Sequence, residues 1–258
     1  MIAAIIQARM SSSRLPGKVL KQIIGKPMLA LQLERVARSV KLDKIIVATS
    51  GSVDDDAINE YCAGAGVACF RGSLGDVLDR YRRAAQYYNA DCIVRLTGDC
   101  PLVDPDVIDH VIDVYQQAEC DYASNTIDPT YPDGLDVEVF SRSALELAWE
   151  KAELPSEREH VTPYIKKSND LKKLNVRGVN DLSALRWTVD DVNDFELATK
   201  VFEALYASNP NFRTDDILSF LAANPAVSRL NASALRDEGY AKSVADDKLH
   251  QSPTRLRK

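Results

Sequence analysis

The chain has 258 residues, of which 45% are hydrophobic and 27% charged, a composition that suits one large α/β domain and excludes disorder over most of its length. Its 32 basic and 38 acidic residues leave a net charge of −6, which excludes a general nucleic-acid-binding protein with a basic surface. No stretch approaches the ~20 consecutive apolar residues of a membrane span, so we expect no membrane association and a cytoplasmic protein.

Short apolar runs alternate with amphipathic stretches in the first half of the chain. Strands are predicted at 2–6, 44–49, 67–70 and 92–96, and helices at 27–40, 54–65 and 75–89. This alternation indicates a parallel sheet that is covered by helices on both faces and binds ligands at the carboxyl ends of its strands.

The pattern changes after residue 120. Strands are predicted in LDVEVF at 135–140, in LKKLNVRGV at 171–179 and in ALRWTVD at 184–190, and helices at 142–152, 155–168, 193–207 and 214–223. A mixed sheet with an inserted, substrate-covering portion at 120–180 fits this order. We therefore expect one domain over 1–240, followed at 241–258 by a polar tail that is flexible or makes an assembly contact.

The basic segment QARMSSSRLPGK at 7–18, the basic loop, follows the first predicted strand. No Asp or Glu precedes Glu34, so Arg9, Arg14 and Lys18 have no acidic partner nearby in the sequence. Such a loop brings backbone N–H groups, serine hydroxyls and cations together on a phosphate. The segment matches neither G-x-x-x-x-G-K-[ST] nor G-x-G-x-x-G. It predicts a site for a small anion, and a solvated basic loop is the alternative interpretation.

Two acidic segments also follow predicted strands. Asp99 lies in RLTGDCPLVDP at 95–105, and Asp190 and Asp191 lie in RWTVDDVNDF at 186–195. Each segment alone is typical of a turn or a helix cap. Two carboxylates at strand ends, together with a cationic loop, form the minimal apparatus for metal-assisted attack on a nucleoside triphosphate, because Mg²⁺ takes one or two carboxylates plus phosphate oxygens.

The chain resembles the SpsF family of spore-coat-polysaccharide-type cytidylyltransferases in six ordered segments: QARMSSSRLPGK, FRGSLGDVLDRY, RLTGDCPLVDP, YPDGLDVEVF, EREHVTPYI and RWTVDD. The resemblance spans about residues 2–200 and extends to the enzymes that make CMP-sialate and CMP-Kdo. It implies a GT-A-like nucleotidyltransferase fold with a mostly parallel, mixed sheet. It also implies transfer of CMP from CTP to a sugar or sugar acid for surface polysaccharide, with Mg²⁺ as cofactor, and a homodimer formed through 120–165.

By this resemblance the nucleotide lies over 1–119. Arg14, Lys18, Asp99 and Asp190 match catalytic positions, and Asp99 and Asp190 match the metal ligands. The nucleotide-binding positions are Arg9, Ser12, Arg14, Lys18, Asp79, Arg80 and Thr97. A helix-face ion pair is the alternative for Asp79 and Arg80. Thr97 stands where relatives often have Gln, and Asp191 where they more often have Thr, so Asp191 either adds a carboxylate or caps a helix.

The acceptor side lies in 120–180. Asp136 and Glu138 alternate along a predicted strand, so with Asp133 they suit hydrogen bonds to sugar hydroxyls. Arg158 and His160 are expected to meet a carboxylate or phosphate of the acceptor, and a structural histidine is the alternative for His160. The competing functions are transfer of another nucleotide, a non-sugar acceptor, and a catalytically silent sugar-nucleotide-binding subunit.

Overall fold

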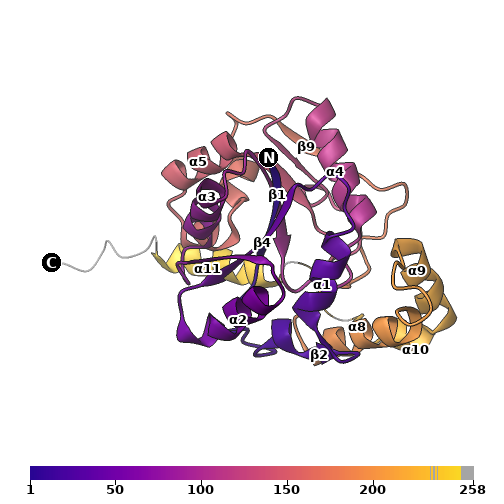
Figure 1. The fold of residues 1–258 in the computed structure, drawn as a ribbon. Helices are drawn as coiled ribbons and strands as arrows, with labels where there is room; N and C mark the ends of the chain where they lie inside the picture. Colours follow the sequence, from indigo (N-terminus) through magenta and orange to yellow (C-terminus); the bar gives the residue numbers. More distant parts are fainter. Residues whose placement is uncertain (233, 235, 237, 251–258) are drawn as a thin grey trace.

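A single mixed sheet forms the centre of the computed structural model, which describes residues 1–232, 234, 236 and 238–250 (Figure 1). Its strands are β1 (Ile2–Gln7), β4 (Lys44–Ser50), β5 (Ala68–Gly72), β6 (Cys92–Thr97), β7 (Tyr122–Ser124), β8 (Glu138–Ser141) and β9 (Lys173–Asn175). Within the described residues these seven strands run in the order β5-β4-β1-β6-β8-β7-β9. Strand β8 is antiparallel to β6 and β7, and the other pairs are parallel. The predicted mostly parallel sheet is confirmed.

Helices cover both faces of this sheet. They are α1 (Met28–Val36), α2 (Asp56–Gly64), α3 (Val77–Tyr87), α4 (Pro105–Gln117), α5 (Arg142–Lys151), α6 (Pro155–His160), α7 (Pro163–Lys167), α8 (Val192–Leu205), α9 (Thr214–Ala223), α10 (Pro225–Ser228) and α11 (Glu238–His250), with short 3-10 turns η1 (Lys18–Leu20) and η2 (Val53–Asp55). A small hairpin joins β2 (Gln22–Ile23) to β3 (Lys26–Pro27).

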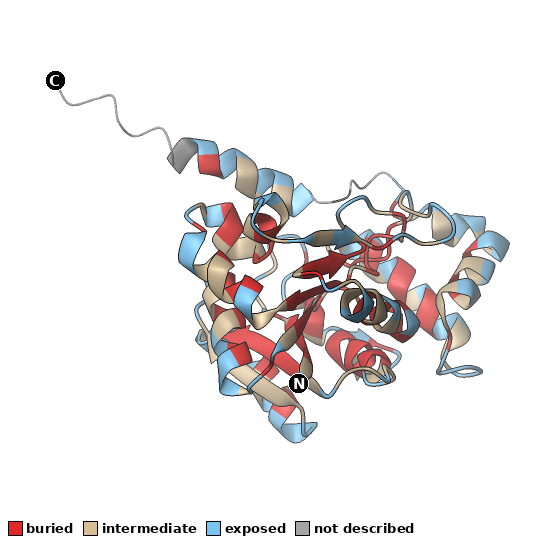
Figure 2. Cartoon of the chain, turned by 90° about the horizontal axis from the view of Figure 1, so that it is seen from above, coloured by how far each residue is buried: buried red, intermediate tan, exposed pale blue. Residues whose placement is uncertain are grey.

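The alternation of β1 divides the core into two layers. Ala3 and Ile5 pack with α3 and α5, whereas Ala4 and Ile6 pack with α1, α2, α4 and α8, and all four side chains are fully buried. Figure 2 shows the buried strands between helices whose inner faces are buried and whose outer faces are exposed. A strand that is buried on both faces must be a continuous run of apolar residues, and residues 2–6 of β1 form such a run.

The carboxyl ends of the central parallel strands bring three loops together. Gln7, the last residue of β1, pairs with Ala48 of β4 on one side and with Thr97 of β6 on the other. The basic loop therefore leaves the sheet beside the Gly98-Asp99 turn, because in-register parallel strands end at the same edge.

The second half departs from the sequence prediction at three places. The strand expected at 184–190 is wrong, because this segment makes a single bridge between Arg186 and Asp133 and otherwise bonds to irregular backbone. The helix expected over 155–168 is split into α6 and α7 at Val161, which has φ +70°. Pro163 lacks an N–H and disfavours helical geometry before it, so one continuous helix cannot form. Strand β8 begins at Glu138, so Asp136 precedes the strand.

Residues 241–250 of the expected tail lie in helix α11, which packs against α6, and 251–258 lie outside the described residues. Its buried Asp247 accepts hydrogen bonds from Ser156 N at 3.0 Å and Ser156 Oγ at 2.5 Å. Among the helices of the described residues, none is long and apolar enough to cross a membrane.

Gly134 is required where the 133–136 segment meets residues 187–188. Its φ is +108°, and a Cβ there would lie 2.5 Å from Thr188 N. We therefore expect Gly134→Ala to lower the free energy of unfolding by about 2–4 kcal/mol, measured by urea denaturation. The matched control is Gly64→Ala in α2, where a Cβ meets nothing within 4 Å. Equal stability of the two variants would contradict this account.

Candidate active site

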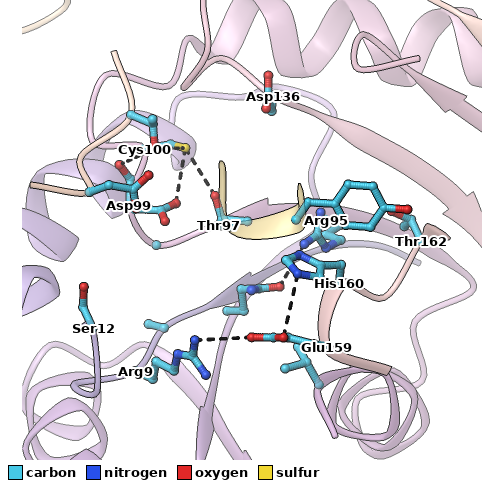
Figure 3. A pocket seen from close by; sticks show the side chains of 18 of the residues that line it. Arg9, Ser12, Arg95, Thr97, Asp99, Cys100, Asp136, Glu159, His160 and Thr162 are labelled. Atoms are coloured by element: carbon cyan, nitrogen blue, oxygen red, sulfur yellow. Dashed lines mark hydrogen bonds and ion pairs between the residues drawn. The ribbon is translucent and has the colours of Figure 1, made fainter. Parts of the chain in front are cut away.

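A cavity of about 540 Å³ opens at the carboxyl ends of β1 and β6 (Figure 3). In Figure 3, Asp99 and Cys100 lie on one side of it, and Arg95, Glu159, His160 and Thr162 lie on the other. The predicted site residues that line it are Arg9, Ser12, Arg14, Lys18, Arg80, Thr97, Asp99, Asp133, Asp136, Glu138, His160 and Asp190. Asp79 and Arg158 do not line it.

The basic loop is shaped by two local features. Gly17 has φ +69°, and its N–H bonds to Met10 O at 2.9 Å, so the loop closes into η1 directly before Lys18. Buried Asp55 accepts the Met10 N–H at 2.7 Å and also bonds to Ser50. This carboxylate thereby ties the basic loop to the end of β4.

Lys18 brings the two predicted metal acids together. Its ammonium lies 3.1 Å from Asp99 Oδ2 and 2.9 Å from Asp190 Oδ1, and it donates to Val189 O at 2.7 Å. Burial lowers the pKa of Lys18, but the two carboxylates outweigh it and hold this pKa above its ordinary value. For Asp99, burial raises the pKa, but nearby Lys18 outweighs it and lowers the pKa to about 2. Lys18 and Asp99 are therefore both ionised at neutral pH.

The buried guanidinium of Arg186 holds Asp190 in place. Arg186 contacts Asp190 Oδ2 at 2.8 Å, Asp133 at 2.8 Å and Asp194 at 3.0 Å. Asp191 caps α8 by accepting the Asn193 and Asp194 N–H groups, so of its two predicted roles the structure shows the cap. The backbone of 186–190 is fixed by Val189 N, which donates to Asp99 O at 2.8 Å.

The arginines of the basic loop contact acids from distant parts of the chain. Arg14 lies 3.0 Å from Asp190 Oδ2 and 2.6 Å from Glu238 Oε2, and Arg9 lies 3.6 Å from Glu159 Oε1. The side chains of Arg9 and Arg14 remain 44% and 39% exposed, so both guanidinium groups are accessible from the cavity.

The predicted Asp79-Arg80 pair separates in space. Asp79 accepts from Trp149 Nε1 at 3.0 Å and lies 4.0 Å from Arg83 on its own helix, which is the predicted structural alternative. Arg80 lines the cavity, is 1% exposed, and donates to Ser73 O at 2.9 Å. Among the described residues its Nε has no hydrogen-bond partner. Burial lowers the pKa of this guanidinium, and an anion in the cavity would stabilise its charge.

Glu138 lines the cavity, but its side chain is buried in a network of hydrogen bonds and ion pairs. It accepts from Tyr122 at 2.5 Å and Thr162 at 2.7 Å, and it pairs with Arg95 and, at 3.1 Å, with Lys166. Burial raises the pKa of Glu138, but its cationic and hydroxyl partners outweigh it and hold the pKa well below the usual range. Its carboxylate oxygens are therefore engaged by protein groups.

The other predicted acceptor residues also have protein partners. Asp136 pairs with Arg236 at 2.5 Å, and His160 Nε2 lies 3.0 Å from Ser243 Oγ of α11. Arg158 points to α3, where it contacts Asp76 Oδ2 at 2.5 Å and donates to Trp149 O at 2.8 Å. His160 and Asp136 therefore lie at the cavity wall, whereas Arg158 joins α6 to the start of α3.

The chain is similar to a known protein family over most of its length. The model of a family described as Cytidylyltransferase matches residues 3–241. The chain belongs to the cytidylyltransferase family. The resemblance expected from the six ordered segments is thereby confirmed, and the protein is a nucleotidyltransferase that uses CTP.

Three relatives cover most of this cytidylyltransferase. An uncharacterized protein of Methanocaldococcus jannaschii is 39% identical over 93% of this chain and 97% of its own length. The spore coat polysaccharide biosynthesis protein SpsF of Bacillus subtilis is 31% identical over 87% of this chain and 95% of its own. The structure of a cytidylyltransferase from Leptospira borgpetersenii has a TM-score of 0.83 at 34% identity and covers 88% of this chain and 96% of that one.

A more distant solved structure shares the fold alone. CMP:2-keto-3-deoxy-manno-octonic acid synthetase in complex with CTP has a TM-score of 0.59 at 19% identity, over 78% of this chain and 98% of that chain. The expected nucleotidyltransferase architecture, a mixed and mostly parallel sheet flanked by helices, is confirmed.

The carboxylates of this cytidylyltransferase fit a hard divalent cation that is shared with a substrate. Asp99 and Asp190 already enclose one cationic group, the Lys18 ammonium, and their side chains are 28% and 26% exposed to the cavity. Over the part of the chain that the structure describes, no group of three or more His, Cys, Asp or Glu side chains is arranged to hold a metal by itself. Two carboxylates at one cavity suit Mg²⁺, which takes further ligands from phosphate and water.

Several cavity residues were not predicted from the sequence. Arg95 and Lys166 line the cavity and pair with Glu138. Glu159 of α6 and Glu238 and Tyr240 of α11 also line it. An arginine inside the apolar run CIVRL was the available signal for Arg95. The others lie on polar helix faces, where solvent exposure explains a charged residue equally well.

Glu138 gives this cytidylyltransferase a testable pH dependence. Because its pKa is lowered in the folded state, its contribution to stability is present above the unfolded-state pKa of ~4.3 and is lost as the pH falls. Glu138→Gln should lower the free energy of unfolding at pH 7 by about 3 kcal/mol, because Arg95 and Lys166 lose their counter-charge. Urea denaturation at several pH values should show this difference shrinking from about pH 5 toward pH 3. A difference independent of pH would contradict the assignment.

Proposed function

We propose that the cavity binds CTP with a divalent cation, Mg²⁺ by preference, and transfers CMP to a sugar or sugar-acid oxygen with release of pyrophosphate. The observation that carries this proposal is that Lys18 of the basic loop contacts both Asp99 and Asp190. The same loop also presents Arg9 and Arg14 to the cavity. Cations for phosphate oxygens and carboxylates for a metal thus lie within one cavity.

The names of the relatives support a sugar-acid acceptor. The Bacillus subtilis relative is named for spore coat polysaccharide biosynthesis. The mitochondrial 3-deoxy-manno-octulosonate cytidylyltransferase of Arabidopsis thaliana is 37% identical over 140 residues, which is 52% of this chain and 47% of that protein. Two cations, Arg95 and Lys166, share the single carboxylate of Glu138 at the cavity wall, and this leaves a net positive charge that suits an acidic acceptor.

The proposed division of the chain places the nucleotide on 1–119 and the acceptor on 120–180. Arg9, Ser12, Arg14, Lys18, Arg80 and Thr97 line the cavity from the first segment, and Asp133, Asp136, Glu138 and His160 line it from the second. We assign direct contact with the acceptor to Asp136 and His160, and assign Asp133 and Glu138 to holding Arg186, Arg95 and Lys166 in place.

Transfer in this site rests on positioning and electrostatics. Arg9, Arg14 and Lys18 bind the triphosphate and stabilise the charge that develops on the leaving pyrophosphate. Asp99 and Asp190 would hold the divalent cation, which supplies Lewis-acid neutralisation of the phosphate oxygens when bound. Both carboxylates that the Lys18 ammonium contacts are the proposed metal ligands, so Lys18 is placed to exchange these two contacts for phosphate oxygens. The wall at 133–160 orients the acceptor oxygen for in-line attack.

A homodimer formed through 120–165 and a cytoplasmic location stay predictions. Exposed apolar side chains near the β9 edge, Ile127 at 43% and Leu174 at 37%, support a contact on that side of the sheet.

The reaction is tested by pyrophosphate release with CTP, Mg²⁺ and a panel of 2-keto-3-deoxy sugar acids and sugar phosphates. We expect release with a sugar acid, and at least a hundredfold lower turnover for Asp99→Asn, about the size of a lost electrostatic contact in the transition state. CTP affinity measured without metal should change far less. Asp54→Asn, an exposed acid of η2 outside the cavity, is the control. No release with any acceptor, despite CTP binding, would overturn the proposed reaction.

Arg14 tests where the triphosphate lies. Arg14→Ala should weaken CTP binding in calorimetry by roughly 10- to 100-fold, because a charge-assisted contact to phosphate is lost. Lys21→Ala is the matched control, since Lys21 is exposed and lies outside the cavity. An unchanged affinity in the Arg14 variant would favour the solvated-loop interpretation of the basic loop.

A further inference from the structure

Helix α11 returns over the cavity from the far end of the chain. Its first three residues, Glu238, Gly239 and Tyr240, line the cavity. The ring of Tyr240 stands edge-on to His160, with centroids 5.2 Å apart. Figure 1 shows this helix, in yellow, below α3, and it packs against α6.

Two contacts hold the body of α11 in place behind these residues. Ser243 Oγ donates to Glu159 Oε2 at 2.9 Å and lies 3.0 Å from His160 Nε2. Farther along, buried Asp247 accepts two hydrogen bonds from Ser156. The helix is therefore attached to α6 at points away from Glu238, and its first turn stays over the cavity whether or not Glu238 has a partner.

Glu238 contacts the guanidinium that the proposed function assigns to the triphosphate. Its Oε2 lies 2.6 Å from Arg14 Nη1, and the two side chains are 40% and 39% exposed. An ion pair of such exposure is weak and exchangeable. A carboxylate presents to arginine the same kind of anionic oxygens that a phosphate does. Glu238 and a phosphate therefore compete for Arg14.

We propose that Glu238 is an internal competitor for the pyrophosphate end of the nucleotide site. CTP displaces it from Arg14 on binding, and after transfer it returns to Arg14 and promotes release of pyrophosphate. Because α11 is anchored through Ser243 and Asp247, the displaced carboxylate remains close at a high effective concentration. This inference rests on the proposed function, in which Arg14 binds the phosphates that leave.

The competition predicts a ligand-specific effect of Glu238→Gln, which keeps the shape of the side chain and removes its charge. Calorimetry without metal should show pyrophosphate and CTP binding roughly two- to fivefold more tightly, the size of an exposed ion pair, with CMP affinity unchanged. Pyrophosphate should inhibit turnover more strongly by a similar factor. Asp246→Asn, an exposed acid on the same helix, is the matched control and should change neither affinity.

Two outcomes would overturn the inference. Unchanged pyrophosphate affinity in Glu238→Gln would remove the competition, and equal tightening of CMP would indicate a general charge effect. In the Arg14→Ala background, Glu238→Gln should have no further effect on pyrophosphate binding. If Arg14→Ala alone leaves CTP affinity unchanged, the proposed function fails together with this inference. If it weakens CTP while Glu238→Gln changes nothing, only the inference fails.

Discussion

The ammonium of Lys18 between the carboxylates of Asp99 and Asp190 is the contact on which the site depends. It joins residues that are 81 and 172 positions apart in the chain, and it does so at the shared edge of the central parallel strands. The supports around it follow from this need. Gly17 allows the chain to turn directly before Lys18, and Asp55 fixes the part of the basic loop that precedes this turn. Arg186 pairs with Asp190 and holds it in place. Burying these charges is tolerable only because each has an opposite partner.

The charges of the basic loop are compensated within the protein. The cations of the basic loop are matched by Asp99, Glu159, Asp190 and Glu238, which come from four separate segments. In the proposed function, a nucleoside triphosphate with its metal ion carries both kinds of charge, so it would replace these internal pairs rather than meet bare cations. Binding then depends on the difference between the two sets of pairs, and this difference leaves room for weak internal competitors. Arg80 is buried, and its Nε has no partner in the part of the chain that the structure describes, so a ligand would newly stabilise this cation.

The first half of the fold was predictable because its strands are continuous apolar runs and its helices carry a clear periodicity. Val77, Leu78, Tyr81, Ala84 and Ala85 are buried as the periodicity of α3 predicts. The second half was less predictable. The segment RWTVD has an apolar alternation typical of a strand, yet its backbone bonds go to Asp133 and Asp99, which lie outside any strand. Glu138 looked like a ligand for sugar hydroxyls, but two cations from β6 and α7 close around it.

Local periodicity and ordered motifs were enough to identify the family, the parallel sheet, the basic loop and the two acids near it. The ion pairs within the cavity, the predicted residues that turn away from it, and the position of α11 over it became known from the folded chain alone. An ion pair such as Arg14 with Glu238 joins positions 224 residues apart, and no local pattern encodes such a contact. Each side chain alone reads as a solvated charge, and only the packing of the intervening sheet and helices brings the two within 2.6 Å.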